Sequence, residues 1–277
     1  MKLLLLLFLS FSLSFSLHAA ERIITLSPAV NEIVYALGSG DDVVGNTLFC
    51  LYPKASQSVT KVGGYSAPSL ESIVALRPTL VILQKHNYKL AKQLKKLHIT
   101  THIIKIDSLQ SVTKAITNIG RILNHHDKAQ NIIQEINNEL LTLKNIVANK
   151  KILIVIGHNT SLKKRIFVTG KNLYFEDIIK ASGNSNAYQS TRTSQPILNQ
   201  ENIIASNPDI VILLAHSKTE YGLSDNDLIN PWLQLPINAA KTKNIFIVEK
   251  EYAGIPSDRL IYFIEDFKGI LNDAKTQ

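Results

Sequence analysis

The chain has 277 residues and a formal net charge of +8, from 30 lysines and arginines against 22 aspartates and glutamates. The basic residues are scattered and form no arginine- or lysine-rich arm, so the charge does not indicate nucleic-acid binding. The single cysteine, Cys50, excludes an intramolecular disulfide, and we expect it to be a small buried side chain.

Residues 1–20 have the pattern of a secretory signal peptide. Lys2 precedes an apolar run from Leu3 to Leu17, and small residues, Ala19 and Ala20, follow that run. The run is shorter than the roughly 20 residues of a membrane-spanning helix, and an uncleaved anchor is the alternative interpretation. We therefore expect the mature protein to be soluble and exported.

Residues 21–124 predict a first α/β lobe. The expected elements, in chain order, are a strand at 22–26, a helix at 31–37, a strand at 43–45, a helix and an apolar strand within 71–83, a helix at 88–97 and a strand at 101–106. Strands that alternate with helices predict a parallel sheet with right-handed crossover connections.

Residues 125–149 are expected to connect this lobe to a second one. Apolar residues keep a helical spacing from Asp127 to Asn149, and neither glycine nor proline interrupts them. A flexible linker would be rich in glycine, serine and proline. The sequence therefore predicts one long rigid α-helix between the lobes.

Residues 150–277 predict the second α/β lobe. The expected elements are a strand at 151–157, a hairpin-like segment at 165–170, a helix at 174–181, a helix and an apolar strand within 201–213, a strand at 244–250 and a helix at 258–271.

One unit occurs in both lobes. The segment from Glu71 to Leu83 has glutamate, isoleucine, alanine, proline, valine, isoleucine and leucine at the same positions as the segment from Glu201 to Leu213. Each copy reads as a short helix, a proline and a continuous apolar strand, which is typical of a strand buried on both faces. We expect an α/β fold with two lobes, each with a central parallel sheet flanked by helices, and a ligand between them.

The whole chain after residue 20 resembles the periplasmic solute-binding proteins of ABC importers for cobalamin, haem and ferric siderophores. The segments that carry the resemblance are Arg22 to Glu32, Phe49 to Pro53, Val62 to Tyr65, Leu70 to Pro78, and Asn230 to Trp232 with Leu235 and Pro236. The resemblance implies a monomer without a cofactor that captures a metal-chelate nutrient and delivers it to an inner-membrane ABC permease. It implies no enzymatic activity.

The resemblance also implies roles for Glu71 and Glu201. In the family, one acidic residue at the start of this helix on each lobe docks onto basic residues of the permease. A glutamate in the first turn also stabilises the helix dipole, and the two roles are compatible.

Several histidines follow predicted strands, where α/β proteins bind ligands. The histidines are His86, His158 and His216, and Ser27 follows a predicted strand in the same way. The three imidazoles are candidate ligands for haem iron or for a divalent metal such as zinc. This leaves two alternatives to a chelate-binding protein: a protein for a free divalent metal ion, or an exported metal-dependent enzyme. No serine-hydrolase elbow, Walker loop, Rossmann fingerprint or His-Glu-x-x-His helix supports an enzyme.

Tyr65 is the main aromatic candidate, because it follows Gly63 and Gly64 on a predicted loop. The resemblance implies that an aromatic residue here packs on a corrin ring, or that a tyrosine near this place ligates haem iron. Other tyrosines lie on predicted cleft loops: Tyr52, Tyr188, Tyr221 and Tyr252. Trp232, in contrast, is expected to pack in a core.

Two arginines are candidates for binding acidic groups of a ligand. Arg192 falls on a loop that faces the cleft in the family, and Arg259 lies at the start of the last predicted helix, where a surface position is the alternative interpretation. Guanidinium groups bind carboxylates in a bidentate manner. Two such cations would fit a haem or an acidic siderophore better than a corrinoid.

Overall fold

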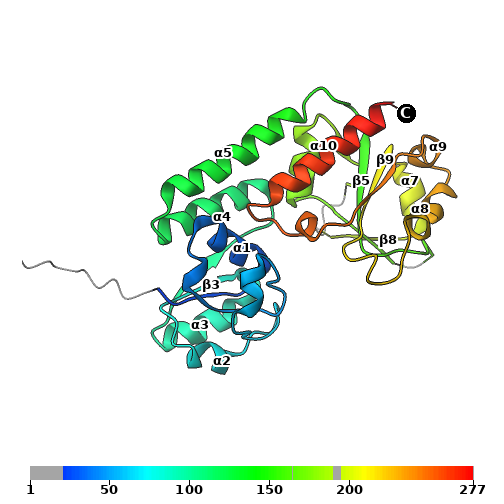
Figure 1. Cartoon of the computed structure of the whole chain (residues 1–277). Coiled ribbons are helices and arrows are strands. Elements are labelled where there is room, and N and C mark those ends of the chain that lie inside the picture. The colour runs from blue at the N-terminus through cyan, green and yellow to red at the C-terminus, as the bar shows by residue number, and fades with distance from the viewer. Residues whose placement is uncertain (1–20, 164, 190–194, 277) are drawn as a thin grey trace, which may run out of the picture.

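The computed structural model describes residues 21–163, 165–189 and 195–276. The expected signal peptide and Arg192 lie outside these residues. Within them the chain forms two α/β lobes that lie side by side, and helix α5 (His126–Thr142) extends along both (Figure 1). None of the helices in the described ranges has the length and apolar character needed to cross a membrane.

The N-terminal lobe has a four-stranded parallel sheet in the order β2-β1-β3-β4. The strands are β1 (Ile23–Thr25), β2 (Val43–Asn46), β3 (Leu80–Gln84) and β4 (Thr100–Ile104). Helices α1 (Pro28–Leu37) and α4 (Leu109–Ile122) cover one face, and α2 (Leu70–Ala75) and α3 (Tyr88–Lys96) cover the other. Both faces of β3 are buried, because Ile82 packs under α1 and α4 whereas Val81 packs under α2 and α3. This explains its continuous apolar sequence.

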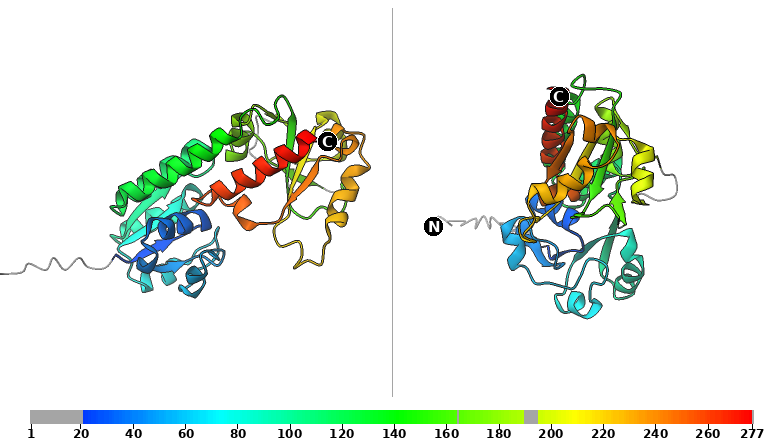
Figure 2. Two further views of the ribbon diagram at one scale, coloured as in Figure 1. Left: turned by 45° about the horizontal axis from the view of Figure 1, so that its top comes forward. Right: turned by 90° about the vertical axis from the view of Figure 1, so that its right-hand side faces the viewer.

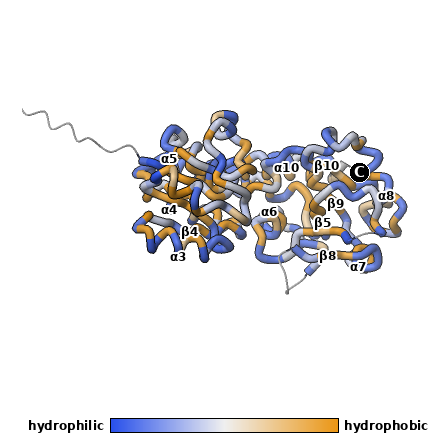
Figure 3. Tube along the Cα trace, turned by 90° about the horizontal axis from the view of Figure 1, so that it is seen from below, coloured by the Kyte–Doolittle hydropathy of each residue, from blue (hydrophilic) through white to orange (hydrophobic). Residues whose placement is uncertain are grey.

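The C-terminal lobe has a six-stranded sheet in which a parallel centre is extended by antiparallel strands. The parallel strands are β5 (Lys151–Ile156), β9 (Ile210–Leu214), β10 (Ile245–Val248) and the short β7 (Ser185–Asn186), and the antiparallel ones are β6 (Ile166–Val168) and β8 (Ile197–Leu198). In Figure 3, β5 and β9 run through the lobe as hydrophobic segments. The two-lobed α/β fold with parallel sheets is thus confirmed, with this antiparallel extension in the second lobe.

Helices cover both faces of this second sheet. They are α6 (Tyr174–Ala181) and α10 (Leu260–Thr276) on one face, and α7 (Gln200–Ser206), α8 (Asp225–Leu233) and α9 (Asn238–Lys241) on the other. Four 3-10 turns complete the described elements: Gly40–Asp42, Lys54–Ser58, Lys85–Asn87 and Glu251–Gly254. Trp232 of α8 is fully buried in the core under this face of the sheet, which confirms the expected packing role.

Helix α5 ends earlier than the sequence predicts. The helix was expected to continue to Asn149, but residues after Thr142 form turns. The amides of Leu143 and Lys144 bond to carbonyls three residues back, and Asn145 then adopts a φ of 64°. Asparagine tolerates this left-handed conformation better than most residues. The apolar spacing misled the prediction because Ile146 and Val147 pack against the core from a turn.

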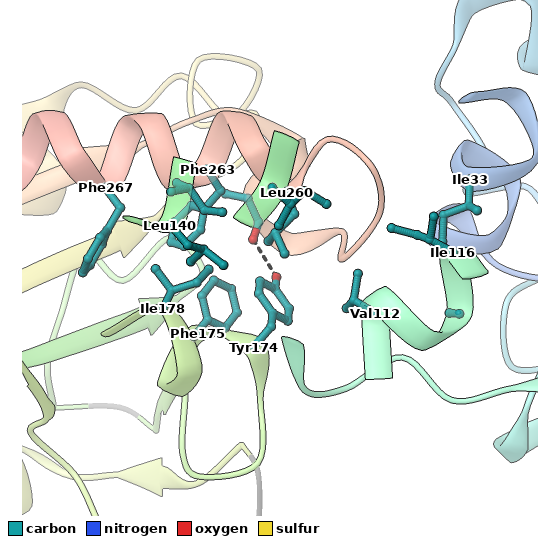
Figure 4. Packing of buried hydrophobic residues seen from close by; sticks show 14 of the residues in the cluster. Ile33, Val112, Ile116, Leu140, Tyr174, Phe175, Ile178, Leu260, Phe263 and Phe267 are labelled. Atoms are coloured by element: carbon teal, nitrogen blue, oxygen red, sulfur yellow. Dashed lines mark hydrogen bonds between the residues drawn. The ribbon is translucent and has the colours of Figure 1, made fainter. Parts of the chain in front are cut away.

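One hydrophobic core runs through both lobes. Helix α4 contributes Val112 and Ile116 from the first lobe, and α6 and α10 contribute Phe175 and Phe263 from the second. Figure 4 shows these side chains in one layer, with the Tyr174 hydroxyl donating to the carbonyl of Ala253 at 2.7 Å. The views in Figure 2 agree that α5 and α10 lie side by side across this layer.

Polar contacts also join the lobes where α4 and α6 begin. The Tyr174 amide donates to the carbonyl of Asp107 at 2.7 Å, and the Leu109 amide donates to the Asp177 carboxylate at 2.8 Å. Each lobe therefore satisfies a backbone amide at the start of the other lobe's helix, where helices lack internal partners.

We predict that the lobes move little when ligand binds. A hinge closure would have to disrupt the continuous core, the unbroken α5, and the hydrogen bonds between the lobes at the starts of α4 and α6. Small-angle X-ray scattering profiles of free and loaded protein are expected to superimpose nearly. A closure of tens of degrees would contradict this rigid arrangement.

Candidate functional site

A cleft of about 680 Å³ lies between the lobes. Its walls include residues at or just after the carboxyl ends of parallel strands in both lobes: Ser27, Gln84, Ile156, Leu214 and Lys250. Ligands bind at this edge of open α/β sheets, and the volume falls within the range of small-molecule sites. Aromatic and aliphatic side chains from connecting segments complete the walls, among them Phe49, Leu51, Tyr52, Tyr65, Leu173, Tyr174, Phe175, Ile255 and Pro256.

The first-lobe wall presents large apolar side chains to solvent. Phe49, Leu51 and Tyr52 are 59%, 55% and 41% exposed, and all three line the cleft. Exposed apolar groups that gather at one place indicate a surface that another molecule covers. This loop is therefore a candidate binding wall.

Buried polar side chains hold the backbone of this loop. Asn31 of α1 donates to the carbonyl of Tyr52 at 3.0 Å, and Ser56 donates to the carbonyl of Cys50 at 3.1 Å. Asn46 donates to Ser56, and the Lys61 ammonium donates to the Asn46 side chain at 2.7 Å. Cys50 is buried as expected, and burial raises the pKa of its thiol. The backbone is thus fixed while the large side chains point outward.

Tyr65 is held by a chain of hydrogen bonds. Its hydroxyl donates to the Gln84 side chain at 2.9 Å, and the Gln84 amide donates to Ser27 at 3.1 Å. Ser27 in turn caps α1. Burial raises the pKa of the Tyr65 phenol, so the side chain is a neutral phenol at neutral pH. The structure places Tyr65 in the cleft wall with a defined ring orientation.

Gly63 gives the Tyr65 loop its shape. Its φ is 112°, a conformation that side chains oppose. A Cβ at this position would lie 2.8 Å from the carbonyl oxygen of Ala67. Gly63 pairs with Pro68 in an isolated antiparallel bridge, so the loop between them turns tightly and carries Tyr65 to the cleft.

The three predicted histidines do not form one site. His216 lines the cleft, whereas His86 lies beside the Tyr65 ring, with its Nε2 3.2 Å from the Tyr65 carbonyl oxygen. The His158 ring lies tilted against the Tyr221 ring, and its Nε2 lies 2.5 Å from the carbonyl oxygen of His216. In the described ranges, no group of three or more His, Cys, Asp or Glu residues is placed to hold a metal. The three-histidine metal site is therefore wrong, because the His86 ring packs beside Tyr65 in the first lobe and the His158 ring beside Tyr221 in the second.

The other aromatic candidates differ in position. The Tyr252 hydroxyl donates to Asp266 of α10 at 2.8 Å, so this side chain lies behind the cleft wall. Tyr188 packs against the second-lobe core, and Tyr221 is exposed beside His158. Tyr52, the fourth of these candidates, does line the cleft. The candidate Arg192 lies outside the described residues.

A buried ion pair at the cleft joins the lobes, and the sequence reasoning missed it. Arg259, which precedes α10, donates from Nε and Nη2 to the two carboxylate oxygens of Glu32 on α1, at 3.0 and 2.6 Å. Its Nη1 donates to Glu251 at 2.8 Å, and Ser257 donates to Glu32. The available signal was Glu32 itself, a charged residue among the mostly apolar residues of the predicted helix. Arg259 is thus committed to protein carboxylates.

Burial dominates the electrostatics of this cluster. It raises the pKa of Glu32, and the hydrogen bonds and charge of Arg259 oppose that rise. Burial, reinforced by the nearby Glu32, raises the pKa of Asp258 to about 7. Among the described residues that line the cleft, the carboxylates of Glu32, Asp107 and Glu251 outnumber the cations of Lys250 and Arg259.

Glu71 and Glu201 lie outside the cleft. Each is exposed at the second position of a short helix, α2 in one lobe and α7 in the other, and neither is among the cleft-lining residues. Hydrogen bonds from its own amide and from Ser69 lower the pKa of Glu71, so this carboxylate is ionised at neutral pH. The symmetric placement is what a two-point docking surface needs, and docking stays a prediction.

Comparisons with known proteins agree with this architecture. The chain is 26% identical over 253 residues to a vitamin B12-binding protein of Vibrio parahaemolyticus, across 90% of this chain and 89% of that one. The vitamin B12-binding protein BtuF of Vibrio cholerae superposes with a TM-score of 0.77 at 19% identity, over 93% of this chain and 99% of that one. The haem-binding protein HutB of Vibrio cholerae gives 0.76 at 23% identity, over 91% and 99%.

The family described as "Periplasmic binding protein" matches residues 23–252. This match includes both sheets, α5 and all the strand ends that line the cleft. The chain therefore belongs to the periplasmic binding protein family.

Proposed function

We propose that this protein is the substrate-binding component of an ABC importer and that it captures a metal-chelate nutrient in the cleft between its lobes. The observation that carries the proposal is the cleft itself, formed at the strand ends of both lobes and walled by exposed aromatic and aliphatic side chains. Such walls fit the flat apolar faces of a macrocycle. The vitamin B12- and haem-binding relatives support this ligand class.

Within that class, the charges at the cleft favour a corrinoid over haem. The sequence suggested that Arg259 would bind ligand carboxylates, but its guanidinium already binds Glu32 and Glu251. The propionates of haem would meet more carboxylates than cations on the described walls, and like charges repel strongly in a partly buried site. The amide groups of cobalamin carry no such charge and suit the polar side chains of Gln84 and Ser27.

The proposal includes delivery to an inner-membrane permease and a periplasmic location. Glu71 and Glu201 would dock on basic residues of the permease, since both are exposed, acidic and separate from the cleft. No catalytic step on the ligand is part of the proposal. We expect the binding protein to act as a monomer.

Ligand titration tests the proposal. Purified protein without its first 20 residues is expected to bind cyanocobalamin more tightly than haemin in isothermal titration, with a ferric siderophore as a third ligand. Tighter binding of haemin would overturn the argument from charge but leave the cleft as the site. If none of the three ligands binds, the proposed function itself is wrong.

A further inference from the structure

The ionic contact between the lobes also reaches the aromatic wall of the cleft. The Arg259 guanidinium carbon lies 3.7 Å from the ring centroid of Tyr52, a close cation–π contact. Arg259 belongs to the second lobe, whereas Tyr52 and Glu32 belong to the first. One side chain thus contacts a buried carboxylate and a cleft-lining ring of the opposite lobe.

Helix α1 contributes to both the backbone position and the ring orientation of Tyr52. Asn31 binds the Tyr52 carbonyl, and the next residue, Glu32, binds the guanidinium that lies on the Tyr52 ring. Glu32 fixes the plane of that guanidinium, because it accepts from two nitrogens of the fork. The carboxylate therefore determines where the cation meets the ring.

We propose that Arg259, aligned by Glu32, is a positioning residue for ligand binding: it holds the Tyr52 ring in the orientation that the ligand meets. The proposal rests on the proposed function, in that the cleft is taken as the ligand site. It extends that function, because Glu32 and Arg259 would contribute to ligand affinity through the Tyr52 ring and without touching the ligand themselves.

The burial of the pair supports a positioning role over a purely stabilising one. Glu32 and Arg259 are 2% and 5% exposed. A buried ion pair gains little net stability over apolar side chains of similar size, because both charges lose their hydration. What apolar side chains cannot supply is a fixed guanidinium plane for the ring of Tyr52. The groups that face Arg259 are Glu32, Glu251, Tyr52 and, at 5.9 Å, Tyr252.

A double-mutant cycle tests this role, with the Kd for cyanocobalamin as the readout. E32Q keeps the shape of the side chain but weakens its hold on the guanidinium, and it is expected to raise the Kd about three- to thirtyfold. Y52A removes the ring, and in that background E32Q is expected to change the Kd by less than about twofold, because the two residues act through one contact. Equal effects of E32Q in both backgrounds would overturn the proposal.

E176Q is the matched control. Glu176 is also a buried acid with one ion pair, to Lys180 at 2.6 Å, but it lies outside the cleft. E176Q is expected to lower thermal stability without changing the Kd. If it weakens binding as much as E32Q, the effect is one of general stability and the proposal fails.

R259K replaces E32Q in this test if E32Q does not fold. It keeps the positive charge but loses the two-nitrogen contact of the guanidinium, and an unchanged Kd would then contradict the proposal. Wild-type protein that binds no chelate would instead refute the proposed function.

Discussion

Replacing both Glu71 and Glu201 with alanine is expected to abolish uptake of the ligand and to leave its Kd for the isolated protein unchanged. The two carboxylates are exposed at matching positions of α2 and α7, and neither lines the cleft. Charges at the edge of an interface mainly guide association and alignment, so losing both removes the two points that orient the lobes on the permease. Uptake of radiolabelled ligand by cells and isothermal titration of the purified variant measure the two effects separately.

The matched control removes two acids from another part of the surface. Glu135 of α5 and Glu265 of α10 are exposed and lie on helices other than α2 and α7. E135A/E265A changes the net charge by the same amount and is expected to support normal uptake. Loss of ligand binding in E71A/E201A, or normal uptake by it, would show that the docking assignment is wrong.

The fold was largely predictable because its signals are local. The repeated units predicted α2 with β3 and α7 with β9, since a strand buried on both faces must be apolar throughout. The end of α5 was not predictable from apolar spacing alone. Ile146 and Val147 keep the helical period, yet they reach the same core from a turn after Asn145 leaves helical geometry. Apolar spacing in a sequence indicates that a residue is buried, but it does not show whether that residue lies in a helix or in a turn.

The site was predictable only in part, for a related reason. The glycines before Tyr65 marked a turn, and the structure places Tyr65 in the cleft wall. The pair of Glu32 and Arg259 joins opposite ends of the chain, and no local pattern identifies such partners. The sequence also did not show whether the His86 side chain points into the cleft. Strand order predicts which edge a residue occupies, but the 3-10 turn after β3 places this imidazole beside Tyr65 and outside the cleft lining.

This placement of Tyr65 leads to the other large expected effect. Y65A is expected to weaken binding of a corrinoid or haem by about 1–3 kcal/mol, or roughly 5- to 150-fold in Kd, as truncation of a packed aromatic anchor does. The hydrogen bond to Gln84 and the contact with the His86 ring order the Tyr65 side chain before the ligand binds. Little side-chain conformational entropy is therefore lost when the ligand packs on it. Isothermal titration with each ligand measures the loss.

Y65F separates the two chemical roles of the tyrosine. If the ring packs on a macrocycle, Y65F retains most of the affinity, because it loses only the hydrogen bond to Gln84. If the oxygen ligates iron, Y65F binds as weakly as Y65A, and the ligand-to-metal absorption of the phenolate disappears. Y88A is the control, since Tyr88 is half exposed on α3 and outside the cleft lining. Should Y65A bind every candidate ligand as tightly as wild type, the ligand does not contact Tyr65, and other aromatic side chains of the cleft, such as Phe49 and Tyr52, would have to supply the contact.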